Sequence, residues 1–113
     1  MATDIRAELH FCGVSAQKVR LVVDLVRSKP AVQAMDLLKF TPKVAAHHVY
    51  KLLAAAGANA EENFGVSRDD LVVYRISADE APTRKWRRFG ARGRFKPLLR
   101  RASHITVILR ERE

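Results

Sequence analysis

A block of basic residues between Ala81 and Arg101 constrains the fold of this chain more than any other feature of its sequence. The block contains nine lysines and arginines and no acidic residue. The whole chain has 21 basic and 12 acidic residues, so the charges outside the block cancel and the net charge of +9 lies within it. Because like charges at this density repel one another, the block cannot form a core, and we expect an anionic partner to neutralise it.

The composition of the block indicates that this partner is a nucleic acid. Seven of the nine cations are arginines, whose planar guanidinium group pairs with phosphate oxygens and stacks on bases. Trp86, Phe89 and Phe95 are suited to stacking on unpaired bases, and Gly90 and Gly93 permit a tight tip. The alternative is a disordered basic loop that attracts polyanions loosely. The nine basic residues are Arg84, Lys85, Arg87, Arg88, Arg92, Arg94, Lys96, Arg100 and Arg101.

The segments on either side of the block both predict β-strands. Leu71–Ala78 and His104–Arg110 are rich in β-branched and aromatic residues. The simplest topology pairs them as one antiparallel hairpin, with the basic block as its extension. Over the nine residues from Pro82 to Gly90, each side of this extension reaches roughly 30 Å at about 3.3 Å per residue.

An edge strand and a first helix are predicted before this hairpin. Asp4–Phe11 partly alternates polar and apolar residues, which is typical of a strand with Ile5, Leu9 and Phe11 on one face. Ser15 is a good N-cap for a helix. The valines that follow it keep the helical period until residues 28–30 end the pattern. These valines are Val19, Val22, Val23 and Val26.

Two further helices follow. Ala31–Phe40 predicts a short helix with Ala34, Leu37 and Leu38 inward. Thr41–Pro42 is typical of a helix start and predicts a third helix from residue 42 to about residue 61. Its apolar stripe comprises Ala45, Val49, Leu52, Leu53, Ala56 and Ala60. Residues 63–65 close it.

Gly57 lies inside the pattern of the third helix. A glycine there costs about 1 kcal/mol of helix propensity. It therefore indicates a close contact, with a partner that the sequence does not identify.

Length and composition favour one small intracellular domain. The 113 residues, 48% of them apolar, suffice for one modest core. A single cysteine, Cys12, allows no internal disulfide, and we expect a half-buried thiol. No segment approaches the roughly 20 apolar residues of a membrane helix, and the N-terminus lacks a signal-peptide pattern. We expect a reducing compartment, either the cytoplasm or an organelle matrix.

Neither catalysis nor metal binding is favoured by the polar residues. Asp69–Asp70 and Asp79–Glu80 are expected in turns, and neighbouring strand residues point to opposite faces, which makes a poor acid–base pair. His47 and His48 are adjacent on a helix and point in directions about 100° apart, which does not form a ligand set. We therefore predict no enzyme, no cofactor and no metal. We expect Asp79 and Glu80 to place negative charge directly before the basic block.

A second anion-binding position is possible at the start of the first helix. Ser15, Lys18 and Arg20 lie at its N-terminus. Because a helix N-terminus with nearby cations can hold a phosphate, these residues are candidates for a phosphate contact. The alternative is ordinary surface charge.

Several short motifs resemble the bacterial type of the large-ribosomal-subunit protein family twenty-two, and the resemblance spans nearly the whole chain. The motifs are Ser15–Val22 (Ser-Ala-Gln-Lys-Val-Arg-Leu-Val), Ala58–Glu61, Asp79–Glu80, Ala91-x-Gly93-Arg94 and Ser103–Val107. Any one of them is weak alone, and together they are specific. Phe89 and Gly90 depart from the family pattern, which commonly has proline and then arginine or histidine.

The resemblance implies a structural, non-enzymatic component of the large ribosomal subunit, with neighbouring ribosomal proteins as partners. Ser15, Lys18 and Arg20 match rRNA contacts of the first helix. Arg84 to Arg101 match a hairpin that runs between rRNA domains, ties them together during assembly and lines the exit tunnel of the nascent polypeptide. The tunnel-lining tip would comprise Arg87, Arg88, Phe89, Gly90, Ala91, Arg92, Gly93 and Arg94. The implied location is the cytoplasmic ribosome, with an organellar ribosome as the alternative.

These observations predict an α+β fold of residues 1–113 as a single domain. Three helices pack on a small antiparallel sheet, and a long basic β-hairpin at about 81–101 protrudes from it. The competing hypothesis is a soluble nucleic-acid-binding regulator. No basic recognition helix is present in the sequence, although a β-ribbon reader of DNA is conceivable.

Overall fold

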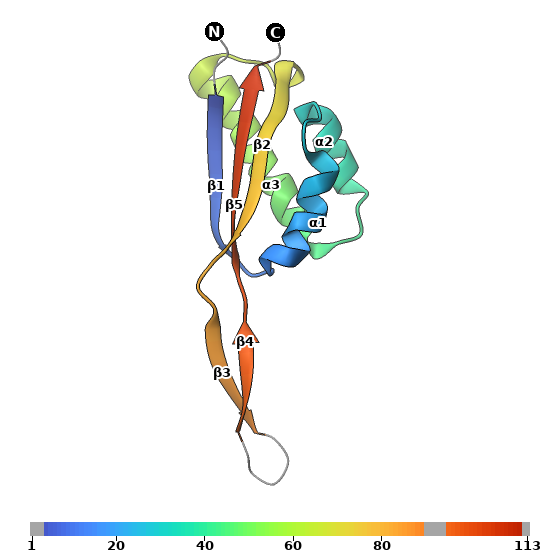
Figure 1. The fold of residues 1–113 in the computed structure, drawn as a ribbon. Helices are drawn as coiled ribbons and strands as arrows, with labels where there is room; N and C mark the ends of the chain where they lie inside the picture. Colours follow the sequence, from blue (N-terminus) through green and yellow to red (C-terminus); the bar gives the residue numbers. More distant parts are fainter. Residues whose placement is uncertain (1–3, 90–94, 112–113) are drawn as a thin grey trace.

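The computed structural model describes residues 4–89 and 95–111, and for residues 84–89 and 95–100 it describes only the backbone (Figure 1). Three α-helices, one 3₁₀ turn and five strands are present in these ranges. In chain order they are β1 (Asp4–Cys12), α1 (Ala16–Val26), α2 (Ala31–Lys39), α3 (Val44–Phe64), η1 (Arg68–Asp70), β2 (Leu71–Glu80), β3 (Arg84–Phe89), β4 (Phe95–Arg100) and β5 (Ser103–Glu111). The predicted α+β class is confirmed.

The strands form a body sheet and an arm. The three-stranded sheet has the order β1-β5-β2, with β5 antiparallel to both neighbours, and β3 and β4 form a separate two-stranded sheet. The predicted pairing of the two strands that flank the basic block is therefore confirmed, and Asp4–Cys12 is an edge strand as expected. Figure 1 shows β3 and β4 extending beyond the body along the line of β2 and β5. The molecule measures 63 × 25 × 19 Å as a result.

All three helices cover the same face of the body sheet. Figure 1 shows α3 behind the sheet and α1 and α2 beside β2. The predicted valine stripe of α1 and the predicted stripe of α3 are buried throughout. Both stripes pack against the inward side chains of the strands, which include Ile5, Val73, Ile105, Val107 and Leu109. This single layered core holds the body together, and β5 at its centre leads directly into the arm.

The end of β1 differs from its predicted pattern. Leu9 pairs with Ile105 and Cys12 pairs with Ser103, so an irregularity falls between them. Phe11 has a φ of 55° there, and its side chain is 63% exposed rather than inward with Ile5. Cys12 takes the inward position and is buried, not half-buried. The prediction for Phe11 was wrong because strict alternation cannot anticipate a β-bulge.

The predicted start of α3 was also wrong. The Thr41 hydroxyl donates a hydrogen bond to the Leu37 carbonyl at 2.8 Å, so it closes α2 instead of capping α3. Lys43 is the N-cap, and the helix begins at Val44. At the other end α3 continues to Phe64, three residues beyond the expected end, and Gly65 terminates it with a φ of 64°.

Two smaller expectations also fail. Leu37 in α2 is 38% exposed rather than inward, because the buried stripe of that short helix runs through Ala31, Ala34 and Leu38. Asp79 and Glu80 end strand β2, opposite His104 and Ser103, and do not lie in a turn.

The close contact expected at Gly57 is with Arg68. A Cβ atom placed on Gly57 would lie 3.3 Å from Nε of Arg68 and 3.4 Å from its Cγ and Cδ atoms. Arg68 Nε is also 3.3 Å from the Glu61 carboxylate. The glycine therefore leaves room for the Arg68 side chain, which lies across α3 next to Glu61.

The outer edge of β2 is covered by α1 and the loop after it. Ser28 donates its backbone N–H to the Val73 carbonyl at 3.1 Å, and Val73 donates to the Lys29 carbonyl at 2.9 Å. Further along the strand, Arg27 and Arg20 donate to the carbonyls of Ile76 and Ala78 at 3.1 and 3.0 Å. Because an uncovered edge strand invites pairing with other chains, these contacts protect β2 and fix α1 against it.

Asp4, Arg110 and Tyr74 link all three strands on the open face of the sheet. Arg110 of β5 donates to both carboxylate oxygens of Asp4 in β1, at 2.7 and 3.1 Å. Its guanidinium carbon lies 3.4 Å from the ring centroid of Tyr74 in β2. The hydrogen bond from Arg110 lowers the pKa of Asp4, and the same bond raises the pKa of Arg110. The pair therefore holds the edges of the sheet at the end opposite to the arm.

Candidate nucleic-acid interface

The backbone register of the arm places like charges opposite one another. Six residue pairs form the β3–β4 ladder, and they include Arg84 opposite Arg100 and Arg88 opposite Lys96. Like-charged residues directly opposite in an antiparallel ladder are destabilising. A two-stranded ladder is also marginal in water by itself. Both effects predict that an anion bound along the arm would stabilise the ladder.

Not all predicted arm residues fall within the described part of the chain. Arg84, Lys85, Arg87, Arg88, Lys96 and Arg100 lie in β3 or β4. The predicted tip residues Gly90, Ala91, Arg92, Gly93 and Arg94 lie outside the described residues. Arg101 follows β4 and is exposed.

Two hydrogen bonds lie where the arm leaves the body. The Ala81 N–H donates to the Ala102 carbonyl at 3.0 Å, which continues the pairing between the strands of the body and of the arm. The Ser103 hydroxyl donates to the Val14 carbonyl at 2.8 Å. Ser103 is fully buried. Its bond therefore fixes the segment before α1 against the base of the arm.

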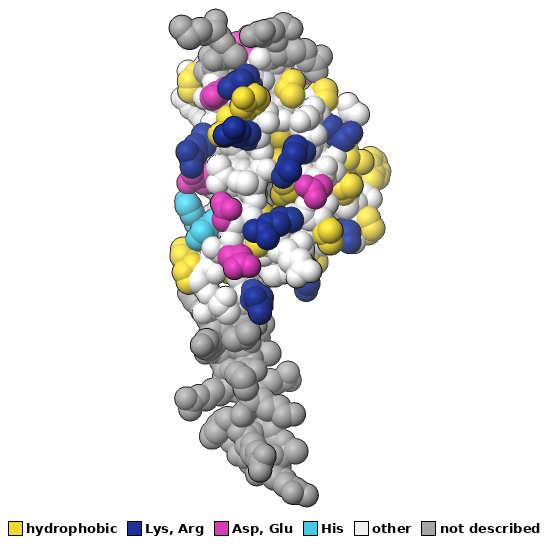
Figure 2. Space-filling model, viewed as in Figure 1, with side chains coloured by type: hydrophobic (Ala, Val, Ile, Leu, Met, Phe, Trp, Pro, Cys, Tyr) yellow, Lys and Arg dark blue, Asp and Glu magenta, His cyan; other side chains and the backbone are white. Residues whose placement is uncertain are grey.

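A groove with a basic lining lies where α1, α3 and the base of the arm meet. Lys18 comes from the first turn of α1, Lys43 caps α3 and Arg101 follows β4. The groove has a volume of about 750 Å³. Its other lining residues are Gly13, Val14, Ser15, Leu21, Val44 and Ala45, so none of the lining residues is acidic. Figure 2 shows basic side chains at the lower end of the body, where the arm leaves it.

Three of the predicted site residues line the basic groove, and a fourth, Arg20, lies outside it. Ser15 and Lys18 share the groove with Arg101. Arg20 does not line it, because the Arg20 Nε atom donates to the Ala78 carbonyl. Lys43 was missed by the sequence analysis. Its position at the groove depends on the N-cap of α3, which the sequence placed two residues too early.

One of the two acidic residues beside the arm lies in a second hollow. Glu80 lines this hollow with Ser15, Gln17, Thr83 and Arg101. Arg101 and Ser15 are thus shared by both hollows. Glu80 therefore adds a negative charge to this second hollow, whereas the described lining of the basic groove contains no acidic residue.

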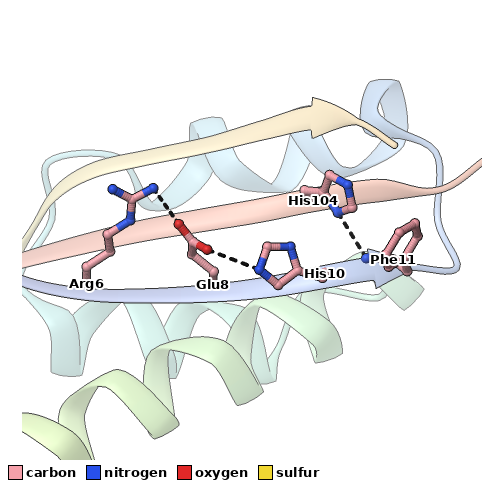
Figure 3. A network of polar contacts seen from close by, with 5 residues as sticks. All are labelled: Arg6, Glu8, His10, Phe11 and His104. Atoms are coloured by element: carbon pink, nitrogen blue, oxygen red, sulfur yellow. Dashed lines mark hydrogen bonds and ion pairs between the residues drawn. The ribbon is translucent and has the colours of Figure 1, made fainter. Parts of the chain in front are cut away.

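The open face of the sheet carries a different, mixed set of charges. Figure 3 shows Glu8 between Arg6 and His10 along β1, with His10 Nε2 at 3.1 Å from the carboxylate. The hydrogen bond from Arg6 lowers the pKa of Glu8. His104 Nδ1 accepts the Phe11 N–H at 3.1 Å, so this histidine supports the β-bulge. Figure 2 shows basic and acidic side chains interspersed over this face, which favours a solvated surface.

Metal sites and membrane-spanning helices are both absent from the described residues. No group of three or more His, Cys, Asp or Glu residues in residues 4–89 and 95–111 is arranged to hold a metal ion. None of the helices found in that part of the chain has the length and apolar character needed to cross a membrane.

Comparison with known proteins decides the family. The model of the family described as "Ribosomal protein L22p/L17e" matches residues 7–110. The chain belongs to this family. It is similar to the large ribosomal subunit protein uL22 of Pediococcus pentosaceus, with 43% identity over 111 residues that cover 98% of this chain and 94% of that protein. It is also similar to uL22 of Caldicellulosiruptor saccharolyticus, with 46% identity over 107 residues that cover 95% of this chain and 88% of that protein.

Family membership confirms the resemblance found in the sequence. The chain is a structural, non-enzymatic constituent of the large ribosomal subunit. The resemblance therefore covers the body and both strands of the arm, since the matched residues run from β1 into β5.

Replacing Ser103 tests the joint between the body and the arm. We expect Ser103→Ala to lower the free energy of unfolding by about 1–2 kcal/mol, because the half-buried Val14 carbonyl loses its hydrogen-bond donor. Urea unfolding followed by circular dichroism measures this loss. Ser77→Ala, at an exposed position of β2, is the matched control and should change the free energy by less than about 0.5 kcal/mol. Equal effects of the two substitutions would contradict the role given to Ser103.

Proposed function

We propose that the chain binds large-subunit rRNA, with the arm as its main anchor. The observation that carries this proposal is the concentration of the whole net charge in a two-stranded arm that protrudes from a charge-balanced body. Phosphates alongside the arm would relieve the repulsion between opposed pairs such as Arg84 and Arg100. We assign the rRNA contacts of the arm to the nine basic residues between Arg84 and Arg101 that the sequence analysis names.

The shape of the arm indicates how it recognises RNA. A two-stranded ribbon is thin enough to lie between RNA helices and to contact phosphates on both sides. Arginine contacts with the phosphate backbone position a protein without reading base sequence. Recognition should therefore depend mainly on the shape of the folded rRNA. We infer that the arm ties separate rRNA domains together during assembly.

The start of α1 would supply a second contact with rRNA. Ser15 and Lys18 line the basic groove together with Lys43 and Arg101. Arg20 is exposed and uses its Nε atom on the Ala78 carbonyl, which leaves its terminal nitrogens to contact a phosphate. Residues 1–113 would thus act as one ribosomal-protein domain with two RNA-binding parts.

We further propose that the arm reaches the nascent-polypeptide exit tunnel. The family resemblance supports this placement, with residues 87–94 as the tunnel-lining tip and the nascent polypeptide and neighbouring large-subunit proteins as partners. The ribosome in question would be that of the bacterial cytoplasm.

Crosslinking tests the tunnel placement. A photoreactive residue at position 91 should crosslink to an arrested nascent chain in assembled ribosomes. Crosslinks to rRNA alone would contradict the tunnel placement.

Charge removal from the arm tests the RNA-binding proposal. In the full-length chain, Arg84, Arg88, Lys96 and Arg100 are all replaced by glutamine. Because each lost phosphate contact flattens the log–log salt dependence of binding by about 0.7–0.9, the slope should fall by roughly 3–4 units. Filter binding to large-subunit rRNA at several salt concentrations measures the slope.

The matched control removes the same charge from the body. It replaces Lys29, Lys39, Lys51 and Arg75 by glutamine, and its slope should stay close to that of the unmodified chain. Equal losses in the two variants would mean that net charge, not the arm, determines the affinity. Duplex DNA is the second ligand in each titration, and tighter binding to DNA than to rRNA would favour the regulator hypothesis instead.

A further inference from the structure

The basic groove has an apolar wall that phosphate contacts alone do not explain. Leu21 and Val44 line the groove with Lys18, Lys43 and Arg101. Leu21 is 59% exposed and Val44 is 73% exposed. Exposed apolar side chains gathered beside polar ones are typical of a contact site, and a phosphate gains little from them.

We propose that this groove binds one unpaired nucleotide of the rRNA. The base would lie against Leu21 and Val44, and its flanking phosphates would contact Lys18, Lys43 and Arg101. This inference rests on the proposed function, because it names the RNA feature that the groove beside α1 recognises.

The dimensions and chemistry of the groove fit such a ligand. Its volume of about 750 Å³ falls within the range of small-molecule sites, about 300–1,000 Å³. A nucleotide needs an apolar surface for its base and cations for its phosphates, and the groove lining supplies both. Proteins that recognise RNA commonly bind bases that have left the stack, and apolar side chains can pack on their faces. No acidic residue belongs to the lining, so none repels the phosphates.

The position of the groove favours RNA over a protein segment as its occupant. Arg101 belongs to the groove and also to the base of the arm. RNA bound along the arm would therefore meet Arg101, which is also a lining residue of the groove. An acidic apolar peptide is the competing ligand, because carboxylates are also attracted by Lys18 and Lys43.

Binding of short RNA hairpins to the full-length chain tests this proposal. Four hairpins each carry one unpaired nucleotide (A, C, G or U) in the same stem, and a fifth hairpin is fully paired. At least one of the four should bind about tenfold more tightly than the paired hairpin, which corresponds to removing roughly 50–60 Å² of apolar surface from water. Methyl resonances of Leu21 and Val44 should move upfield in that complex through the ring current of the base.

Two substitutions on α1 give a matched comparison. Leu21→Gln should remove the preference, so that the paired and unpaired hairpins bind this variant with equal affinity. Leu25, one turn further along α1, is 40% exposed and is not part of the groove lining. Leu25→Gln should therefore keep the preference, and the Leu25 methyl resonances of the unmodified chain should not move.

The outcomes separate this inference from the proposed function. If the chain binds no hairpin and no large-subunit rRNA, the proposed function itself fails. If it binds all five hairpins equally and the Leu21 and Val44 resonances do not move, only the nucleotide site is overturned. A peptide of alternating glutamate and leucine that shifts these resonances at lower concentration than any hairpin would identify the groove as a protein-docking site and would also overturn the inference.

Discussion

Repulsion among the cations of the arm is the constraint on which the rest of the structure depends. The arm carries the whole net charge of the chain and has only one ladder of six residue pairs to hold its strands together. Two of those pairs oppose cation to cation. The arm therefore needs support at one end from a stable body and along its length from an anion. The fold of the body meets the first requirement, and the proposed binding of rRNA would meet the second.

The body supports the arm through its central strand. β5 is paired on both sides and carries the buried side chains Ile105, Val107 and Leu109. It is therefore the best-held strand of the sheet, and β4 precedes it by only two residues. On the other side of the arm, β2 is held at its free edge by Arg20 and Arg27 of α1. Both strands that enter the arm are thus fixed before they leave the core.

The local sequence patterns predicted most helices and strands of the body. The features that they did not predict depend on contacts between residues far apart in the chain. The valines of α1 and the stripe of α3 keep one period over several turns, so their burial followed from spacing alone. The exposure of Phe11 depends on a bulge opposite His104, which lies 93 residues away in the chain. The role of Arg20 depends likewise on the free edge of a strand that the sequence does not place. Such contacts between distant segments leave no periodic signal.

In the candidate interface, too, the sequence predicted one part and missed the other. The arm was predictable because its nine cations are contiguous and no acidic residue interrupts them. The groove was not, because Lys18, Lys43 and Arg101 come from three separate parts of the chain and meet only in the folded body. The sequence analysis identified Lys18 and Arg101 as separate candidate contacts. Only the fold shows that they share one surface with Leu21 and Val44.

Amide hydrogen exchange of the arm tests the central claim most directly. The backbone amides of β3 and β4 are compared with those of β5, in the free chain and in the complex with large-subunit rRNA. If the arm depends on an anion, its amides exchange quickly in the free chain and become protected when RNA binds, while the β5 amides are protected in both states. Equal protection of the arm in both states would show that the ladder is stable without RNA, and this would contradict the account.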